Sequence, residues 1–183
     1  MRIDPTVAGG VILAALAVTL NFLVLGLAVF FLNVGIVGAL LAWLATGAGS
    51  RTPNQMVGPV YLITIPLLTL HGVEEYTGRL YETLPPRFGL EPFEPSQFTS
   101  FNLVWLAVFL VAAVGVFKRI RLSLLVVWFV ALLGCIGNAL FHGYLSLQDG
   151  AYVPGVITAL INFPMGITLT VLLAGSARRD LAP

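Results

Sequence analysis

Residues 56–78 read MVGPVYLITIPLLTLHGVEEYTG, a run long and apolar enough to cross a lipid bilayer as one helix. A helix rises about 1.5 Å per residue and the hydrocarbon core is about 30 Å thick, so a spanning helix needs about 20 residues. Three later segments meet the same requirement: residues 97–117, 122–147 and 153–176. The chain is 58% hydrophobic and only 9% charged, which excludes a soluble domain. We therefore expect an all-α, polytopic transmembrane helix bundle.

The N-terminal apolar run, residues 6–47, is harder to divide into spans. As one helix its roughly 40 residues would measure about 60 Å, twice the thickness of the membrane. We expect two short spans that turn near Leu25 and Gly26, which gives six spans in all. No polar turn marks this join, so one long helix from Thr6 to Gly47, with five spans in all, is the alternative. We divide the chain into an N-terminal transmembrane extension, residues 1–50, and a transmembrane bundle, residues 51–183.

Positive charges near the span ends predict how the chain is oriented in the membrane. Three basic residues occupy the short connection between two spans: Lys118, Arg119 and Arg121. We expect this loop on the cytoplasmic side, and alternation of the spans then places the C-terminus there too. The loop at residues 80–96, which carries three glutamates, faces outward on the same prediction.

Four ionisable residues lie within the predicted spans rather than at their ends: His71, Glu74, Glu75 and His142. They include both histidines of the protein. A charged side chain near the centre of a span costs a few kcal/mol or more, so such residues usually face a bundle interior or a wet cavity and mark function. Offsets of three and four place Glu74 and Glu75 on the same flank of the helix as His71. His142 is predicted at a similar depth, toward the outer end of another span.

Several polar residues are predicted near these four. Asn138 lies one helical turn before the second histidine, and Thr158 and Asn162, four residues apart, lie at a similar depth in the last span. We expect them to hydrogen bond between helices, to orient ligands, or to contact a substrate in one outer-leaflet pocket. Arg79, four residues after Glu75, can pair with that carboxylate or extend to the membrane interface.

The two imidazoles and two carboxylates form a ligand set suited to zinc, iron or manganese. A divalent ion would explain why both glutamates stay ionised in a place of low dielectric constant. We expect His71, Glu75 and His142 to hold the ion, with Glu74, or whichever glutamate is left unbound, as general base for a metal-bound water. Two structural interpretations stay open: glutamates solvated at the membrane interface, and a buried hydrogen-bond network that joins helices without a ligand.

Three classes of function are compatible with this pattern. The favoured hypothesis is a metal-dependent membrane enzyme, most simply a hydrolase, that uses zinc or iron on a lipid or other apolar substrate at the outer leaflet. The alternative is a non-enzymatic cofactor- or pigment-binding subunit, whose N-terminal extension docks a membrane protein partner. The third is an ion- or proton-coupled transporter. Membrane lipid is the expected partner, and a net charge of +1 gives no indication of nucleic-acid binding.

The motif HGVEE, residues 71–75, matches the signature of the HXXEE family of bacterial integral membrane proteins. The chain resembles that family again at NALFH, residues 138–142, and at PGVIT, residues 154–158, with a later NFP. The resemblance runs from about Tyr61 to the end of the last span, so the N-terminal forty or so residues would be an addition to it. It implies a compact helix bundle in the bacterial inner membrane, with a metal-binding or enzymatic centre at the motif histidines and glutamates. It implies no particular reaction.

Overall fold

The computed structural model describes residues 4–25, 30–46 and 53–180, and within those ranges it contains helices and no strand. The helices are, in chain order, α1 (Pro5–Leu25), α2 (Phe30–Ala45), α3 (Val57–Thr77), α4 (Leu80–Thr83), the 3-10 helix η2 (Pro85–Phe88), α5 (Pro95–Phe117), α6 (Ser123–Phe129), the π-helical stretch η3 (Val130–Gly137), α7 (Asn138–Asp149) and α8 (Val156–Asp180). The prediction of an all-α helix bundle is confirmed.

Within the described ranges, five helices are long and apolar enough to cross a membrane. They are Pro5–Phe22, Val57–Thr77, Pro95–Phe117, the continuous helix Ser123–Asp149 and Val156–Ser176. The sixth apolar helix, α2, has only 16 residues and spans about 24 Å. The N-terminal run is therefore two helices and not one long helix, and they lie side by side, joined by a hydrogen bond of 3.3 Å from Asn21 to Asn33. The turn expected at Leu25 and Gly26 falls largely in residues 26–29, outside the described ranges.

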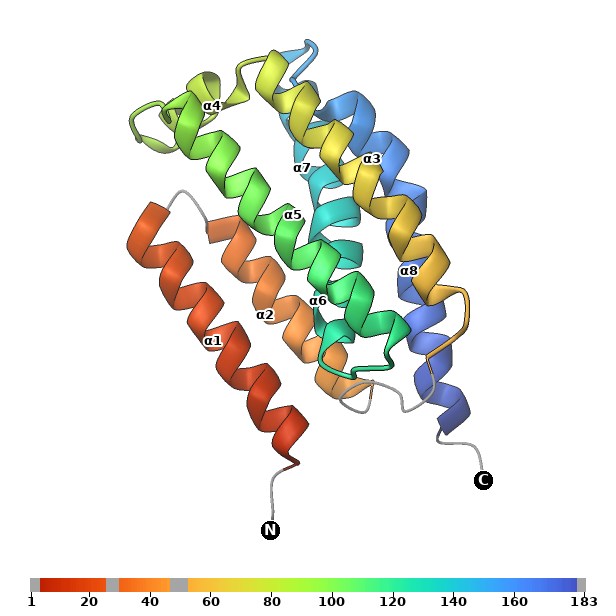
Figure 1. The fold of residues 1–183 in the computed structure, drawn as a ribbon. Coiled ribbons are helices and arrows are strands. Elements are labelled where there is room, and N and C mark those ends of the chain that lie inside the picture. Colours follow the sequence, from red (N-terminus) through yellow and green to blue (C-terminus); the bar gives the residue numbers. More distant parts are fainter. Residues whose placement is uncertain (1–3, 26–29, 47–52, 181–183) are drawn as a thin grey trace.

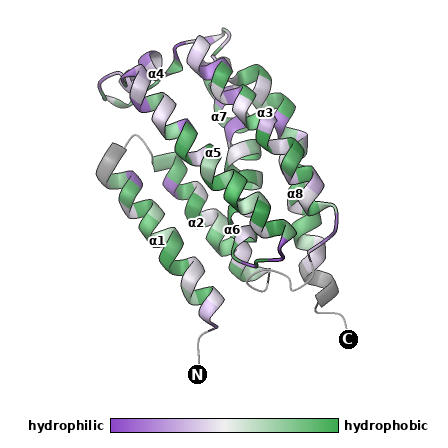
Figure 2. Ribbon diagram, in the orientation of Figure 1, coloured by the Kyte–Doolittle hydropathy of each residue, from purple (hydrophilic) through white to green (hydrophobic). Residues whose placement is uncertain are grey.

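The helices run up and down, so that α1 begins and α8 ends at the same end of the bundle (Figure 1). Asp4, at the start of α1, forms an ion pair of 3.2 Å with Arg121 in the connection from α5 to α6. At the opposite end, Arg87 of η2 pairs with Asp149 at the end of α7. Hydrophilic residues gather around α4 at one end and in the α5–α6 connection at the other (Figure 2). This arrangement fits a bundle with two wet ends and an apolar middle.

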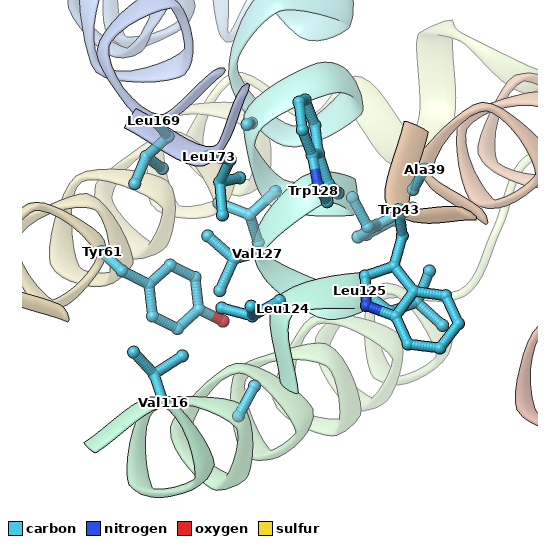
Figure 3. Close-up of a cluster of buried hydrophobic side chains, with 14 of the residues drawn as sticks. Ala39, Trp43, Tyr61, Val116, Leu124, Leu125, Val127, Trp128, Leu169 and Leu173 are labelled. Carbon is cyan, nitrogen blue, oxygen red and sulfur yellow. The ribbon is translucent and has the colours of Figure 1, made fainter. Parts of the chain in front are cut away.

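A single apolar core joins the N-terminal helices to the rest of the bundle (Figure 3). Trp43 of α2 is fully buried, and its indole N–H donates to the carbonyl of Arg121 at 3.2 Å. Tyr61 of α3 is also fully buried, and its hydroxyl donates to the carbonyl of Phe109 at 3.2 Å, which satisfies a polar group inside the apolar layer. The core is continuous across residue 50, so the proposed division of the chain there stays a prediction.

The π-helical stretch η3 interrupts the long helix just before the residues of interest on α7. Helix α8 packs against it so closely that a Cβ added at Gly166 would lie 2.6 Å from the Cβ of Cys135. Cys135 itself is fully buried and unpaired, as expected of a small buried hydrophobe. A π-helical turn holds more residues than an α-turn, so it rotates the face that the following residues present, and such turns occur often at functional sites.

Candidate metal centre

His71 and Glu75, one turn apart on α3, meet His142 of α7 at the end of the bundle that carries α4. One carboxylate oxygen, Oε1 of Glu75, lies 3.3 Å from Nε2 of His71 and 3.1 Å from Nε2 of His142. The two imidazole rings stand edge to face with their centroids 4.9 Å apart. Both histidines are buried, with 4% and 1% of their surfaces exposed. The tertiary structure therefore brings together the three residues expected to bind a metal.

A chain of hydrogen bonds fixes the tautomer of His71. The hydroxyl of Thr158 on α8 donates to Oε2 of Glu74 in a short hydrogen bond, so its oxygen must accept from Nδ1 of His71, 3.0 Å away. With a proton on Nδ1, the neutral His71 ring carries a lone pair at Nε2, whereas the imidazolium would carry a second proton there, 3.3 Å from Glu75. That nitrogen is buried, has no hydrogen-bond partner among the described residues, and faces the carboxylate of Glu75. Two lone pairs directed at each other repel, unless a proton or a metal ion lies between them.

Glu74 points away from this cluster, to the beginning of α8. Its Oε1 accepts from the hydroxyl of Tyr152 at 2.7 Å and from the backbone N–H of Ile157 at 3.3 Å. Its Oε2 accepts from the backbone N–H of Thr158 at 2.8 Å as well as from the hydroxyl of that residue. A helix N-terminus has unpaired N–H groups and a partial positive charge, so it stabilises a carboxylate. The adjacent glutamates thus bind different partners.

Tyr152 lies in the connection between α7 and α8. Partial burial and the neighbouring Glu74 carboxylate raise the pKa of the Tyr152 hydroxyl, so the group stays protonated and can donate its hydrogen bond. No spacing in the sequence indicates that it contacts Glu74, because the two residues lie 78 positions apart.

Gly155 closes the other side of the histidine pair. A Cβ at this position would lie 2.5 Å from Cε1 of His142 and 3.0 Å from Cε1 of His71. The backbone φ of Gly155 is +97°, a conformation that side-chain-bearing residues rarely adopt. The sequence analysis did not single this residue out; its one signal is the Pro–Gly pair directly before a helix, which is typical of a tight turn.

A pocket of about 310 Å³ adjoins the three candidate ligands, which form part of its wall. Aromatic rings supply much of the remaining wall, among them Phe31 of α2, Phe88 and Phe93 of the segment between α4 and α5, Phe101 and Trp105 of α5, and Phe141 of α7. Asn138 of α7 also lines the pocket. Its side-chain amide makes no hydrogen bond to any other described residue, so it remains available to a ligand.

Two other residues from the sequence analysis lie elsewhere. Arg79 forms an ion pair of 2.7 Å with Glu82, so the pairing with Glu75 that we considered is wrong. The reason is local, because Arg79 adopts a left-handed conformation with φ of 57° just after α3 ends, which ends the helical register with Glu75. Asn162 is fully buried and donates to the carbonyl of Leu67 at 3.3 Å. It joins α8 to α3 below the histidines.

The donor set fits a small divalent ion. His71, Glu75 and His142 contribute two imidazole nitrogens and one carboxylate oxygen. These candidate ligand atoms all lie within 4.8 Å of one another. Ligands about 2.1 Å from a tetrahedral zinc ion lie about 3.4 Å apart, close to the 3.1 and 3.3 Å separations in this cluster. Three protein ligands leave a position open, which is the arrangement found in catalytic rather than structural zinc sites.

A family model described as "Protein of unknown function with HXXEE motif" matches residues 62–169, more than half of the chain. The chain belongs to this HXXEE family, and the match begins after the two N-terminal helices. Comparisons with curated proteins and with solved structures gave no match. The description of the family names a motif and no reaction.

Proposed function

We propose that this protein is a metal-dependent membrane enzyme whose divalent ion, zinc or iron, is held by His71, Glu75 and His142. The observation that carries the proposal is Nε2 of His71, which is buried, lies 3.3 Å from the Glu75 carboxylate and has no hydrogen-bond partner among the described residues. A buried acceptor without a donor costs about 1–3 kcal/mol, and a second acceptor beside it adds to that cost. An ion between the two removes the cost and makes both atoms ligands.

The ion would supply Lewis acidity, either to a substrate oxygen or to a bound water. The chain supplies the rest. Glu75 provides the negative charge that matches the ion, and the adjoining aromatic pocket holds an apolar substrate and excludes bulk water. Hydrolysis is the simplest reaction for such a centre. We place the substrate at the outer leaflet of a bacterial inner membrane, on the orientation predicted from the basic α5–α6 connection.

The contacts of Glu74 support a positioning role for this residue. Both of its oxygens already accept two hydrogen bonds each, so no free lone pair points at the pocket in this arrangement. Through Thr158 it holds the proton of His71 on Nδ1. Polar groups behind a metal ligand commonly act in this way, by orienting the imidazole and raising its basicity. The general-base role that we considered for Glu74 would require it to leave these partners first.

The test is the metal content of the purified protein. We expect about one zinc or iron per wild-type chain, because two histidines and a carboxylate suit either ion. His71→Ala and His142→Ala should each lose most of it, whereas Cys135→Ala should keep it, because the buried thiol lies outside the cluster. Equal content in all four proteins would overturn the proposal. A strong visible absorbance band of a macrocycle would favour the cofactor-binding alternative.

A further inference from the structure

The pocket beside the candidate ligands is apolar over most of its wall and carries little charge. Among the described residues that line it, Glu75 is the one carboxylate and none is lysine or arginine. Proteins that bind phosphate use arginine, lysine or clustered backbone N–H groups to balance its charge. Arg87 lines the neighbouring pocket and is held by Asp149 through two hydrogen bonds. A phosphorylated headgroup would therefore find no lysine or arginine side chain in the pocket.

The size of the pocket limits its ligand to a small or single-chain molecule. At about 310 Å³ it lies at the lower end of the range for small-molecule sites, roughly 300–1,000 Å³. A two-chain phospholipid exceeds this volume. Three side-chain amides line the pocket, those of Gln97, Asn102 and Asn138. Gln97 and Asn102 each bond to a backbone group at or near the start of α5, whereas Asn138, one helical turn from His142, makes no hydrogen bond to a described residue. An amide can donate to or accept from an uncharged oxygen function.

The pocket adjoins surfaces that face lipid rather than water. Two mostly apolar grooves, of about 450 and 670 Å³, flank α5, and Trp105 lines both of them as well as the pocket. Leu103 lines one groove and Val104 the other, and both side chains are about three-fifths exposed. Because α5 is a candidate membrane span, these exposed apolar side chains meet hydrocarbon. A hydrophobic chain can thus approach the pocket from within the bilayer.

From these observations we infer that the ligand of the site is an uncharged, single-chain amphiphile, such as a long-chain alcohol, aldehyde or ester. Its oxygen function lies at Asn138 and the candidate metal ligands, and its chain lies against the aromatic wall that includes Phe101 and Trp105. This inference rests on the proposed function only for the contact between the ligand's oxygen group and the metal. The binding of the chain itself requires only the pocket.

The experiment uses fluorescence quenching in the full-length protein. The chain has three tryptophans, of which Trp43 and Trp128 are buried in the core and Trp105 lines the pocket. Brominated 16-carbon chains carrying either an alcohol or a phosphate group are added to protein in phosphatidylcholine nanodiscs, with and without a loaded divalent ion. We expect saturable quenching by the alcohol in both forms, lost in Trp105→Phe. In the metal-free form we expect at least about tenfold weaker binding of the phosphate, because its charge has no lysine or arginine partner there.

Two variants test whether quenching reports the pocket rather than the lipid surface. Gly134 lines the pocket, and its nearest neighbour, a methyl of Leu68, lies 3.5 Å from an added Cβ, so Gly134→Leu should fill the pocket and abolish saturable quenching. Its control is Gly38→Leu on α2, where an added Cβ meets nothing within 4 Å. Asn138→Leu should weaken binding of the alcohol about tenfold through the lost hydrogen bond, whereas Asn33→Leu, outside the pocket, should not.

The outcomes separate this inference from the proposed function. Equal or tighter binding of the phosphate chain to the metal-free protein would overturn the uncharged ligand. Quenching that never saturates, or that persists in Gly134→Leu, would overturn the pocket as the binding site. Saturable binding of the alcohol by a wild-type protein that takes up no zinc or iron when either ion is supplied would overturn the proposed function and leave the pocket and its ligand class intact.

Discussion

Glu74 and Glu75 are neighbours in the chain, yet one binds the beginning of α8 and the other a pair of histidines. The difference follows from the helix, because successive residues point about 100° apart around the axis. Glu75 shares the face of His71, four residues earlier, whereas Glu74 is turned toward α8. Glu75 therefore lies at a ligand position, and Glu74 fixes the tautomer of His71 through Thr158.

Thr158 connects these two roles, and its removal is the sharpest test at the scale of a single residue. Thr158→Val keeps the shape of the side chain but removes the hydroxyl that bridges Glu74 and His71. We expect metal affinity to fall about 10- to 100-fold, as is typical when a partner behind a metal ligand is lost. Competition with a chelator of known affinity measures the change.

The matched control is Thr168→Val on the same helix, whose exposed hydroxyl bonds only to the carbonyl of Pro164. It should leave the affinity unchanged. An unchanged affinity in Thr158→Val would show that the tautomer of His71 is fixed in some other way.

Gly155 makes a second prediction at this scale. Gly155→Ala would force a Cβ to within 3.0 Å of both imidazoles and would impose a side chain on a backbone with φ of +97°. We expect loss of metal binding together with a lower thermal unfolding temperature, since steric and backbone strain both disfavour the native arrangement. Gly175→Ala is the control, because an added Cβ there meets nothing within 4 Å. Full metal content in Gly155→Ala would contradict the close packing described for this turn.

At the scale of elements, the contact of α8 with η3 holds the helix that carries Thr158 against the helix that carries His142. An added Cβ at Gly166 would lie 2.7 Å from the carbonyl oxygen of Ala131 and 2.8 Å from Cγ1 of Ile136. We expect Gly166→Val to destabilise the protein by about 1–3 kcal/mol, the usual cost of overpacking a close interface. Thermal unfolding in detergent measures this loss.

Gly38→Val on α2 is the matched control, because it faces open space and should change stability little. If the two glycine variants unfold at the same temperature, the α8–η3 contact is looser than its geometry indicates.

At the scale of the whole molecule, the up-and-down topology places the α4 end and the α5–α6 connection at opposite ends of the bundle. In a Cys135→Ala background, the variants Glu91→Cys and Lys118→Cys should therefore react with an impermeant maleimide from opposite sides of the membrane. The basic connection predicts that Lys118 is cytoplasmic. Labelling of both from one side would contradict a bundle in which α5 crosses the membrane.

Removal of the metal should also lower the stability of the whole molecule, because the ion would join two helices. Glu75 on α3 and His142 on α7 are 67 positions apart in the sequence. A ligand that binds only the folded state adds about 2.7 kcal/mol of stability when its free concentration is 100 times its Kd. We expect a chelator to lower the unfolding temperature of the wild type and to leave that of His71→Ala unchanged. An equal effect on both proteins would indicate that the chelator acts elsewhere.

The sequence by itself determined the helical class, the main spans and the candidate ligands on α3. Hydropathy and the period of the α-helix are local properties, so a run of about 20 apolar residues and a spacing of four between His71 and Glu75 can be read without coordinates. Only the tertiary structure decided which side chains meet across helices. The pairing of Glu74 with the beginning of α8, the approach of Gly155 to both histidines and the aromatic wall of the pocket each depend on how α3, α5, α7 and α8 pack. Packing angles and rotamers arise from contacts between distant segments, and no spacing along the chain encodes them directly.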